Sequence, residues 1–280
     1  MHSQIIKIDY SKNKTHWHFF CSDLHFGNKG QNRKALKKDF DLALERKAHI
    51  YINGDWGDFI MSGDRKRYTP SSDAYGTDNN INMTINDAYD FLSPYAHLIR
   101  FIGVGNHCVS VQKYNNFDPT QQLIYSLNKE HKTQIQHGQY CGFILLKYHD
   151  KEQRVRTFKI FYNHGQGGTS EVTKGTIDIS RHMATKNADL IHLGHKHTKV
   201  LLPSEWILDV NMNGEVVERE RCGMITASYL NISGQYDAMK EGYKINYGEE
   251  RMRGLQSVGG IFMSHTLGGV DTQINRRFEL

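Results

Sequence analysis

Short apolar runs alternate with segments of helical periodicity along most of the chain, and this alternation is the feature that most constrains the fold. Residues 16–21, 49–53 and 98–104 read as strands, and 31–47 and 86–97 read as helices. Further strands are predicted at 143–148, 154–162 and 188–193, and further helices at 120–128 and 171–185. Such alternation is typical of an α/β domain with mixed sheets.

The remainder of the chain has a different pattern. Asn213-Gly214 separates two strand-like runs at 206–211 and 215–220, which predicts a β-hairpin. No repeat or interdomain linker stands out in the sequence. We therefore expect one domain over residues 1–280, with a polar loop insertion at about 61–86 and a β-rich C-terminal part at about 205–280.

Composition narrows the class of protein. The aromatic content of 11% argues against disorder, and the net charge of +5 fits an anionic ligand without requiring one. The four cysteines form no CxxC pair, which speaks against a zinc knuckle or a disulfide framework. The first 14 residues lack an apolar signal core, and no stretch approaches the ~18 apolar residues of a membrane span, so we expect a soluble, cytoplasmic protein.

Histidine is unusually frequent, with 16 residues, and it is the commonest metal ligand in proteins. Polar clusters rich in histidine and aspartate follow five of the predicted strands. These clusters are Asp23-x-His25, Gly54-Asp55-x-x-Asp58, Gly105-Asn106-His107, His164, and Gly194-His195-x-His197. Each cluster on its own could be a structural element, such as a turn, with no role in binding. Together, their residue types, order and position at strand ends predict a site for divalent metals, because open α/β sheets bind ligands there.

This set of motifs resembles the pattern of the calcineurin-like metallophosphoesterase superfamily, which it follows in order from Asp23 to His197. The resemblance implies an α/β fold with a four-layer αββα sandwich, in which two mixed β-sheets are flanked by helices. It also implies a hydrolase that cleaves phosphate esters with two divalent metal ions and a metal-bridging hydroxide as nucleophile. Manganese, iron, zinc and nickel all accept such a mixed histidine and carboxylate set.

The resemblance further implies a role for each motif residue. One metal would be bound by Asp23, His25, Asp55 and His197, and the other by Asp55, Asn106, His164 and His195. His107 would be the catalytic residue that protonates the leaving oxygen. Asp58 would orient a ligand histidine by a hydrogen bond, although a surface or turn carboxylate is an equally good interpretation.

One position departs from the family pattern. Cys108 stands where the family usually has an acidic residue after the Gly-Asn-His motif. A thiol supports a protonated histidine poorly, so either another carboxylate substitutes or His107 titrates at lower pH. Among the histidines without a motif role, His182 is the one whose position between metal motifs merits attention.

The substrate is less constrained than the reaction. Arg65, Lys66 and Arg67 lie in the polar loop after Asp58 and are candidates for binding substrate phosphates, although a solvated charged loop is the plainer interpretation. Together with the net charge, they favour a phosphodiesterase acting on nucleotides or nucleic acid. The alternatives are a phosphomonoesterase, such as a phosphoprotein phosphatase, and an inactive metal-bound scaffold. The sequence does not determine the oligomeric state.

Overall fold

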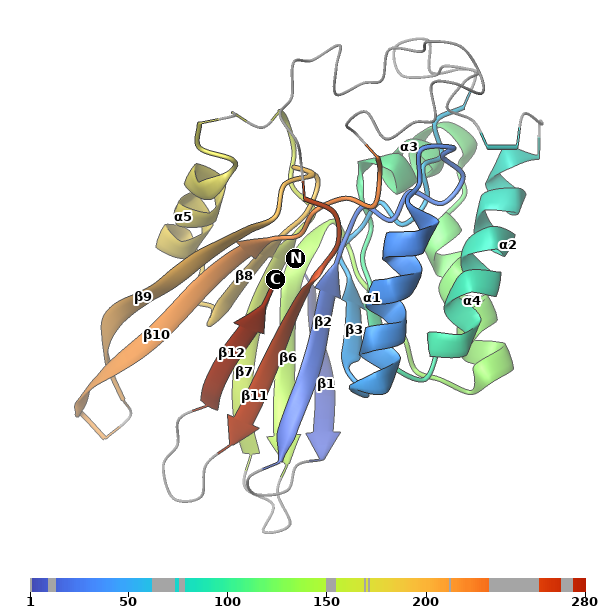
Figure 1. Ribbon diagram of the computed structural model, residues 1–280. Coiled ribbons are helices and arrows are strands. Elements are labelled where there is room, and N and C mark those ends of the chain that lie inside the picture. The colour runs from blue at the N-terminus through green and yellow to red at the C-terminus, as the bar shows by residue number, and fades with distance from the viewer. Residues whose placement is uncertain are drawn as a thin grey trace.

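Two six-stranded sheets lie face to face in the computed structural model, and helices cover their outer sides (Figure 1). The structure describes residues 2–9, 14–61, 74–75, 79–149, 155–168, 170, 172–211, 213–231, 257–267 and 274–280. This arrangement confirms the predicted sandwich of two mixed sheets between helices. No helix within these ranges is long and apolar enough to cross a membrane.

The first sheet carries three of the motif clusters. Its strand order is β12 (Ile274–Glu279), β11 (Ile261–Leu267), β2 (Thr15–Cys21), β3 (His49–Ile52), β4 (Ile99–Ile102) and β5 (Gln136–His137). The four strands from β2 to β5 are parallel, whereas β11 pairs antiparallel with both β2 and β12. The carboxyl ends of β2, β3 and β4 therefore lie at one edge of this sheet.

The second sheet carries the other two clusters. Its strand order is β1 (His2–Asp9), β6 (Cys141–His149), β7 (Val155–Asn163), β8 (Leu190–Leu193), β10 (Val216–Ile225) and β9 (Val200–Val210). β7 and β8 are parallel, so they also end side by side. Asn53 stands directly after β3. Its side-chain amide donates to the backbone carbonyl oxygens of Asn163 at 3.1 Å and His192 at 3.2 Å, which connects the end of β3 in the first sheet to β7 and β8 in the second.

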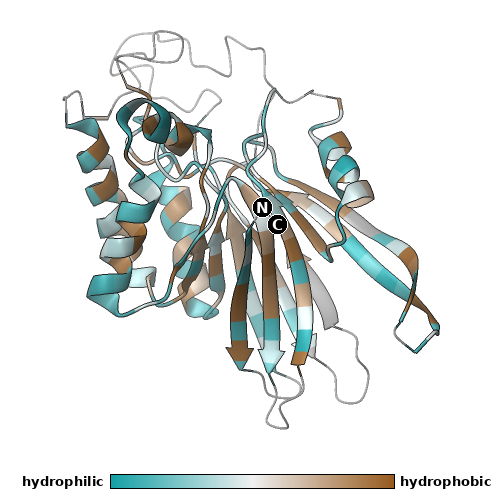
Figure 2. Cartoon of the chain, turned by 180° about the vertical axis from the view of Figure 1, so that it is seen from behind, coloured by the Kyte–Doolittle hydropathy of each residue, from teal (hydrophilic) through white to brown (hydrophobic). Residues whose placement is uncertain are grey.

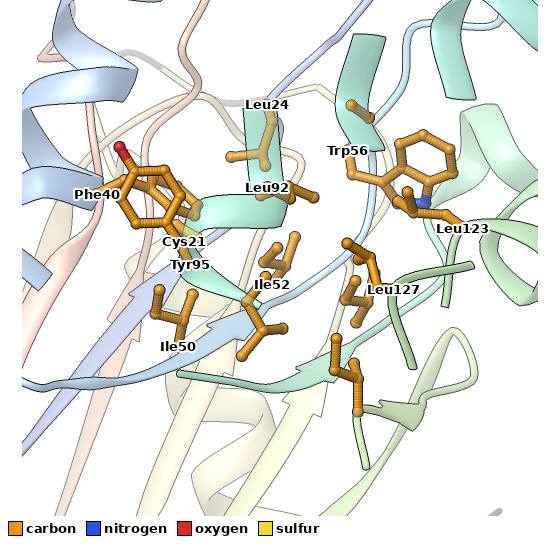
Figure 3. Packing of buried hydrophobic residues seen from close by; sticks show 14 of the residues in the cluster. Cys21, Leu24, Phe40, Ile50, Ile52, Trp56, Leu92, Tyr95, Leu123 and Leu127 are labelled. Atoms are coloured by element: carbon orange, nitrogen blue, oxygen red, sulfur yellow. The ribbon is translucent and has the colours of Figure 1, made fainter. Parts of the chain in front are cut away.

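Most helices pack on the first sheet. They are α1 (Arg33–Glu45), α2 (Asn80–Leu92) with the short 3-10 helix η1 (Ser93–Tyr95), α3 (Asn106–Asn115) and α4 (Pro119–His131). Figure 3 shows side chains from these helices, such as Phe40, Leu92 and Leu127, packed against Ile50 and Ile52 of β3. α4 covers the helix predicted at 120–128 and begins at Pro119, where the Asp118 carboxylate accepts from the backbone amides of Thr120 and Gln121.

The second sheet is covered by α5 (Thr176–Thr185), whose Ile179 and Met183 pack on Phe161 and Ile191. Between the sheets lies a separate core that includes Phe20, Phe101, Ile144 and Ile160. Hydrophobic and hydrophilic residues alternate along many of the strands (Figure 2), as expected for sheets in which each face has a different neighbour.

Several elements differ from the sequence-based expectations. Residues 2–9 form β1, an edge strand whose Ile6 and Ile8 point into the core, although this segment is polar overall. α2 begins at Asn80, inside the expected insertion at 61–86, because Thr84, Ile85 and Ala88 give it a buried face. α3 was not expected, since it is short and buries only Cys108 and Val111. Residues 62–73 and 76–78 of the expected loop lie outside the described residues.

Candidate metal centre

The five motif clusters converge at the ends of five strands. Asp23 and His25 follow β2, Asp55 and Asp58 follow β3, Asn106 and His107 open α3 after β4, His164 follows β7, and His195 and His197 follow β8. Backbone hydrogen bonds connect the first two clusters, since Asp23 donates to the Gly54 carbonyl and His25 to the Asp55 carbonyl, each at 3.1 Å. Residues far apart in the sequence thus form one compact site.

Five residues of this site have left-handed backbone conformations, which residues other than glycine rarely adopt. The φ angles are +55° for Asp23, +52° for His25, +44° for Asp55, +64° for His195 and +55° for His197. Such conformations are costly and persist where the surrounding structure fixes them, which happens most often at functional sites. Here all five are residues of the candidate metal centre.

The glycines of the motifs are explained by close contacts. A Cβ atom on Gly54, which has φ +79°, would lie 2.6 Å from Nδ1 of His164 and 2.8 Å from the amide nitrogen of Gly105. A Cβ atom on Gly105 would lie 2.1 Å from Oδ1 of Asp55. Neither glycine can be replaced without displacing a side chain or backbone segment of the site.

One group of potential ligands consists of Asp23, His25 and His197. The Nε2 atoms of the two histidines are 3.4 Å apart, and Oδ1 of Asp23 lies 3.2 Å from Nε2 of His197 and 3.9 Å from Nε2 of His25. Metal–ligand bonds of about 2.0–2.2 Å leave neighbouring ligand atoms roughly 3–3.5 Å apart. Two of the three spacings therefore match those of ligands around one divalent cation, and the third, between Asp23 and His25, is longer.

A second group consists of Asp55, His164 and His195, whose candidate ligand atoms all lie within 4.8 Å of one another. Oδ2 of Asp55 is 2.8 Å from Nε2 of His164. Oδ1 of Asp23, from the first group, is 3.9 Å from the same nitrogen, so the two groups adjoin. The side-chain oxygens Oδ1 of Asn106 and Oδ1 of Asp23 are buried without a hydrogen-bond partner, which suits atoms that bind a cation.

Hydrogen bonds to the other ring nitrogens orient two of the histidines. Nδ1 of His25 lies 2.8 Å from Oδ1 of Asp58, and Nδ1 of His164 donates to the backbone carbonyl of Asn53 at 2.8 Å. In both residues Nε2 is left to face the cluster. This is the usual way in which proteins fix the tautomer of a metal-binding histidine.

Burial and opposite charges act together on the ionisation of the site. Burial opposes charge on His164, but the carboxylates of Asp55 and Asp23 outweigh it and raise the pKa of His164 to about 9. Burial likewise disfavours ionised Asp55, yet His164 and His107 hold the pKa of this carboxyl well below its usual range. The pKa of His195 falls to about 4, chiefly because of burial and the neighbouring His164. The Asp55 carboxyl is therefore ionised and ready to bind a cation.

His107 is held beside both aspartates that follow β3. Its Nδ1–H donates to the backbone carbonyl of Asp58, and its backbone amide donates to Oδ1 of Asp55 at 3.0 Å. Its Nε2 atom lies 3.8 Å from Oδ2 of Asp55. Because Nδ1 is engaged, Nε2 is the atom that can exchange a proton with a substrate.

A buried hydrogen-bonded chain supports Asp23 from behind. The Ser22 hydroxyl donates to Oδ2 of Asp23 and lies 2.8 Å from the Thr226 hydroxyl, which in turn lies 3.2 Å from Nε2 of His192. The backbone amide of His195 donates to the same Oδ2 atom at 2.9 Å. With Oδ2 engaged twice, Asp23 presents Oδ1 to the cluster.

The sequence motifs do not include Ser22 and Asn53, which form hydrogen bonds with the candidate ligands Asp23 and His164, or Thr226, which contacts Ser22. The only sequence signal was that Ser22 and Asn53 precede motif residues. His182 lies on α5 against Phe161, with ring centroids 5.1 Å apart, and belongs to none of the possible metal-binding groups in the described part of the chain. Arg65, Lys66 and Arg67 fall outside the described residues.

The solved structures that are similar to this chain include two phosphoesterases. One is a conserved uncharacterized protein from Streptococcus pneumoniae, a predicted phosphoesterase, at 10% identity and a TM-score of 0.34, covering 95% of this chain and 89% of that one. The other is the calcineurin-like phosphoesterase YfkN from Bacillus subtilis, at 12% identity and a TM-score of 0.40, covering 95% and 90%. No protein-family profile and no curated protein matches the chain. These structural similarities are too weak to support a conclusion about function, which rests on the sequence motifs and on the geometry of the site.

Proposed function

We propose that this protein is a metal-dependent phosphoesterase of the calcineurin-like type that works with two divalent cations. The observation that carries the proposal is the convergence of two adjoining aspartate and histidine groups, with His107 against the Asp55 carboxylate. Asp23, His25 and His197 would hold one cation, and Asn106, His164 and His195 the other. Asp55 would contact both, because a carboxylate has two oxygens. Manganese is the first metal to test, since sites of this mixed type accept it.

When bound, the two cations supply positive charge for the phosphate and acidify a water molecule, which provides the nucleophile. The protein's own side chains would supply the proton and orient the metal-binding histidines. Nε2 of His107 would give a proton to the leaving oxygen, while the Asp58 carbonyl holds the ring by Nδ1. Asp58 and Asn53 keep the rings of His25 and His164 in the orientation that presents Nε2. No serine or cysteine nucleophile is required.

We favour a phosphodiester in a nucleotide or nucleic acid as the substrate. The support is the net charge of +5 together with the basic run at Arg65, Lys66 and Arg67. A phosphomonoesterase is the alternative, and it would need additional cationic groups for the dianion.

We also propose a cytoplasmic location, because all four cysteines are free and three of them, Cys21, Cys108 and Cys222, are buried.

The proposal is tested by loading the metal-free protein with manganese and measuring hydrolysis of bis-p-nitrophenyl phosphate and p-nitrophenyl phosphate. We expect metal-dependent turnover of the diester that exceeds turnover of the monoester. A reversed preference supports the monoesterase alternative. Two bound ions per chain with no hydrolysis of either substrate, across manganese, iron, zinc and nickel, would point to the inactive scaffold.

A further inference from the structure

The hairpin of β9 and β10 extends beyond the sheet to which it belongs (Figure 1). β8 pairs with residues 222–225 of β10, whereas residues 216–221 pair with 205–210 of β9 and with no other described strand. We call residues 205–210 and 216–221 the outer ribbon. A two-stranded ribbon that packs against nothing is marginally stable in water, so its two faces decide whether it needs a partner.

One face of the outer ribbon is anchored to the body of the protein. Arg219 forms ion pairs with Asp189 at 2.8 Å and with Asp209 at 2.9 Å. Arg221 donates to the backbone carbonyl of Met183, in α5, at 2.8 Å. Both arginines on this face therefore have partners within the molecule.

The opposite face exposes four large apolar side chains. Trp206, Leu208 and Val210 alternate along β9, and Val216 lies opposite Val210 on β10. Their exposed fractions are 61% for Trp206, 74% for Leu208, 61% for Val210 and 69% for Val216. Single exposed apolar residues are ordinary, but four large ones on one face of a ribbon mark an interaction surface.

This apolar face is the continuation of the inner side of the sheet. Cys222 and Met224 of β10 belong to the core between the two sheets, and the partly buried Leu201 of β9 packs against it. There the first sheet covers the apolar side chains, whereas in the outer ribbon they are exposed. The sequence therefore keeps apolar side chains on this face of β9 beyond the point at which other described residues cover it.

We propose that a second copy of this chain covers the apolar face of the outer ribbon, β9 against β9 about a two-fold axis near Leu208. The arrangement of charge favours this occupant. The register places Glu218 opposite Leu208 and Glu220 opposite Trp206, so the carboxylates on this face all belong to β10. Contact through β9 joins the two apolar stripes and leaves the carboxylates at the rim, where like charges stay apart.

The same face is unsuited to the polyanionic substrate favoured above. Of its six residues, Trp206, Leu208, Val210, Val216, Glu218 and Glu220, two are acidic and none is basic. The proposed dimer therefore does not depend on the proposed phosphoesterase activity, and an experiment can contradict one proposal without contradicting the other.

Sedimentation equilibrium of the full chain tests the dimer. We expect a mass that approaches twice 32.3 kDa as concentration rises. Leu208→Lys and Trp206→Lys should each weaken dimerisation about 30-fold or more, the minimum effect of an interface hot spot. Tyr114→Lys is the matched control, because Tyr114 is 72% exposed on α3, and it should leave the dimer intact. A wild-type chain that stays monomeric, or lysine variants that dimerise normally, would overturn the proposal.

Cysteine cross-linking tests the position of the axis. In a Cys141→Ser background, which removes the cysteine that is not buried, Leu208→Cys should give a disulfide-linked dimer under mild oxidation. Thr157→Cys, at an exposed position on β7, should not. Cross-linking at position 157 but not at 208 would place the contact elsewhere and contradict the proposed interface.

Discussion

Oδ1 of Asp58 lies 2.8 Å from Nδ1 of His25 and 3.7 Å from Nδ1 of His107, so one carboxylate serves a candidate metal ligand and the candidate acid. This relationship bears on the unusual Cys108. Burial and the Asp55 carboxylate raise the pKa of the Cys108 thiol to about 12, and its side chain lies in the hydrophobic core. Cys108 therefore cannot supply a negative charge to His107. Asp55 and Asp58 are the carboxylates that lie against its ring.

Asp55→Asn should remove at least one of the two metal ions and lower turnover by about 10³-fold or more, because several kcal/mol of transition-state stabilisation depend on the cations. Asp55 is the carboxylate that contacts both His164 and the backbone of His107. Metal analysis by mass spectrometry and a bis-p-nitrophenyl phosphate assay measure the two effects. The control is Asp41→Asn, on the exposed surface of α1. Two tightly bound ions with retained turnover in Asp55→Asn would falsify its assignment.

His107→Ala should retain both metal ions but slow turnover by about 10²–10⁴-fold, the usual contribution of a general acid. Part of this loss should disappear with p-nitrophenolate as the leaving group, since it needs little protonation. His131→Ala, an exposed histidine on α4, is the control and should behave as wild type. A fall in metal content in His107→Ala would instead identify His107 as a ligand.

Ser22→Ala should weaken manganese binding by about 10–100-fold, the usual effect of losing a hydrogen bond to a metal ligand. The Ser22 hydroxyl is one of two donors that hold Oδ2 of Asp23. Titration calorimetry on the metal-free protein measures this without any substrate. Ser93→Ala removes a comparable hydroxyl, bonded to the Tyr89 carbonyl at 2.7 Å, and should leave the affinity unchanged. Equal affinities in the two variants would mean that Ser22 does not position Asp23.

The polar clusters could be predicted from the sequence because each candidate metal ligand lies shortly after the end of a strand, and parallel strands carry their ends to one edge. The residues that hold the candidate ligands in position could not be predicted in this way. Thr226 reaches Ser22 from 204 positions away, through the pairing of β10 with β8, which no local pattern reveals.

The elements that sequence analysis missed have a common physical cause. β1 has only Ile6 and Ile8 as deeply buried apolar residues, so its alternation is too short to stand out from a polar segment. α3 has a weakly apolar face, and its position depends on the contact between the His107 amide and the Asp55 carboxylate rather than on its own periodicity. In both cases tertiary contacts outweigh the local pattern.

Buried neutral histidines should make the protein less stable in mild acid. His18 lies between Tyr51 and Tyr148, at 3.1 Å and 2.8 Å from their hydroxyls, and burial together with His265 and His49 lowers its pKa well below 6.5. The unfolded chain then takes up a proton below pH 6.5 that the folded chain refuses. Stability is full above that pH and falls below it, by about 1.4 kcal/mol per pH unit for each such group.

Urea unfolding of the metal-free protein between pH 7 and pH 4.5 measures this slope. His18→Gln should be less stable at pH 7, because hydrogen bonds are lost, but its stability should fall less steeply with acid. His131→Gln, an exposed control, should keep the wild-type slope. Parallel curves for wild type and His18→Gln would show that His18 is not a source of the acid sensitivity.

Replacement of Arg65, Lys66 and Arg67 by alanine tests the choice of substrate. If these cations meet phosphates beyond the scissile one, the triple variant should raise KM for an oligonucleotide diester, and the salt dependence of KM should become shallower. Hydrolysis of bis-p-nitrophenyl phosphate should stay nearly unchanged, because that small molecule offers no second phosphate to bind. The matched control replaces Lys34, Lys37 and Lys38 of α1, which removes the same charge from another surface. Similar losses in both triple variants would indicate a general effect of net charge. No change in KM for the oligonucleotide would remove the basic run from substrate recognition and favour the monoesterase alternative.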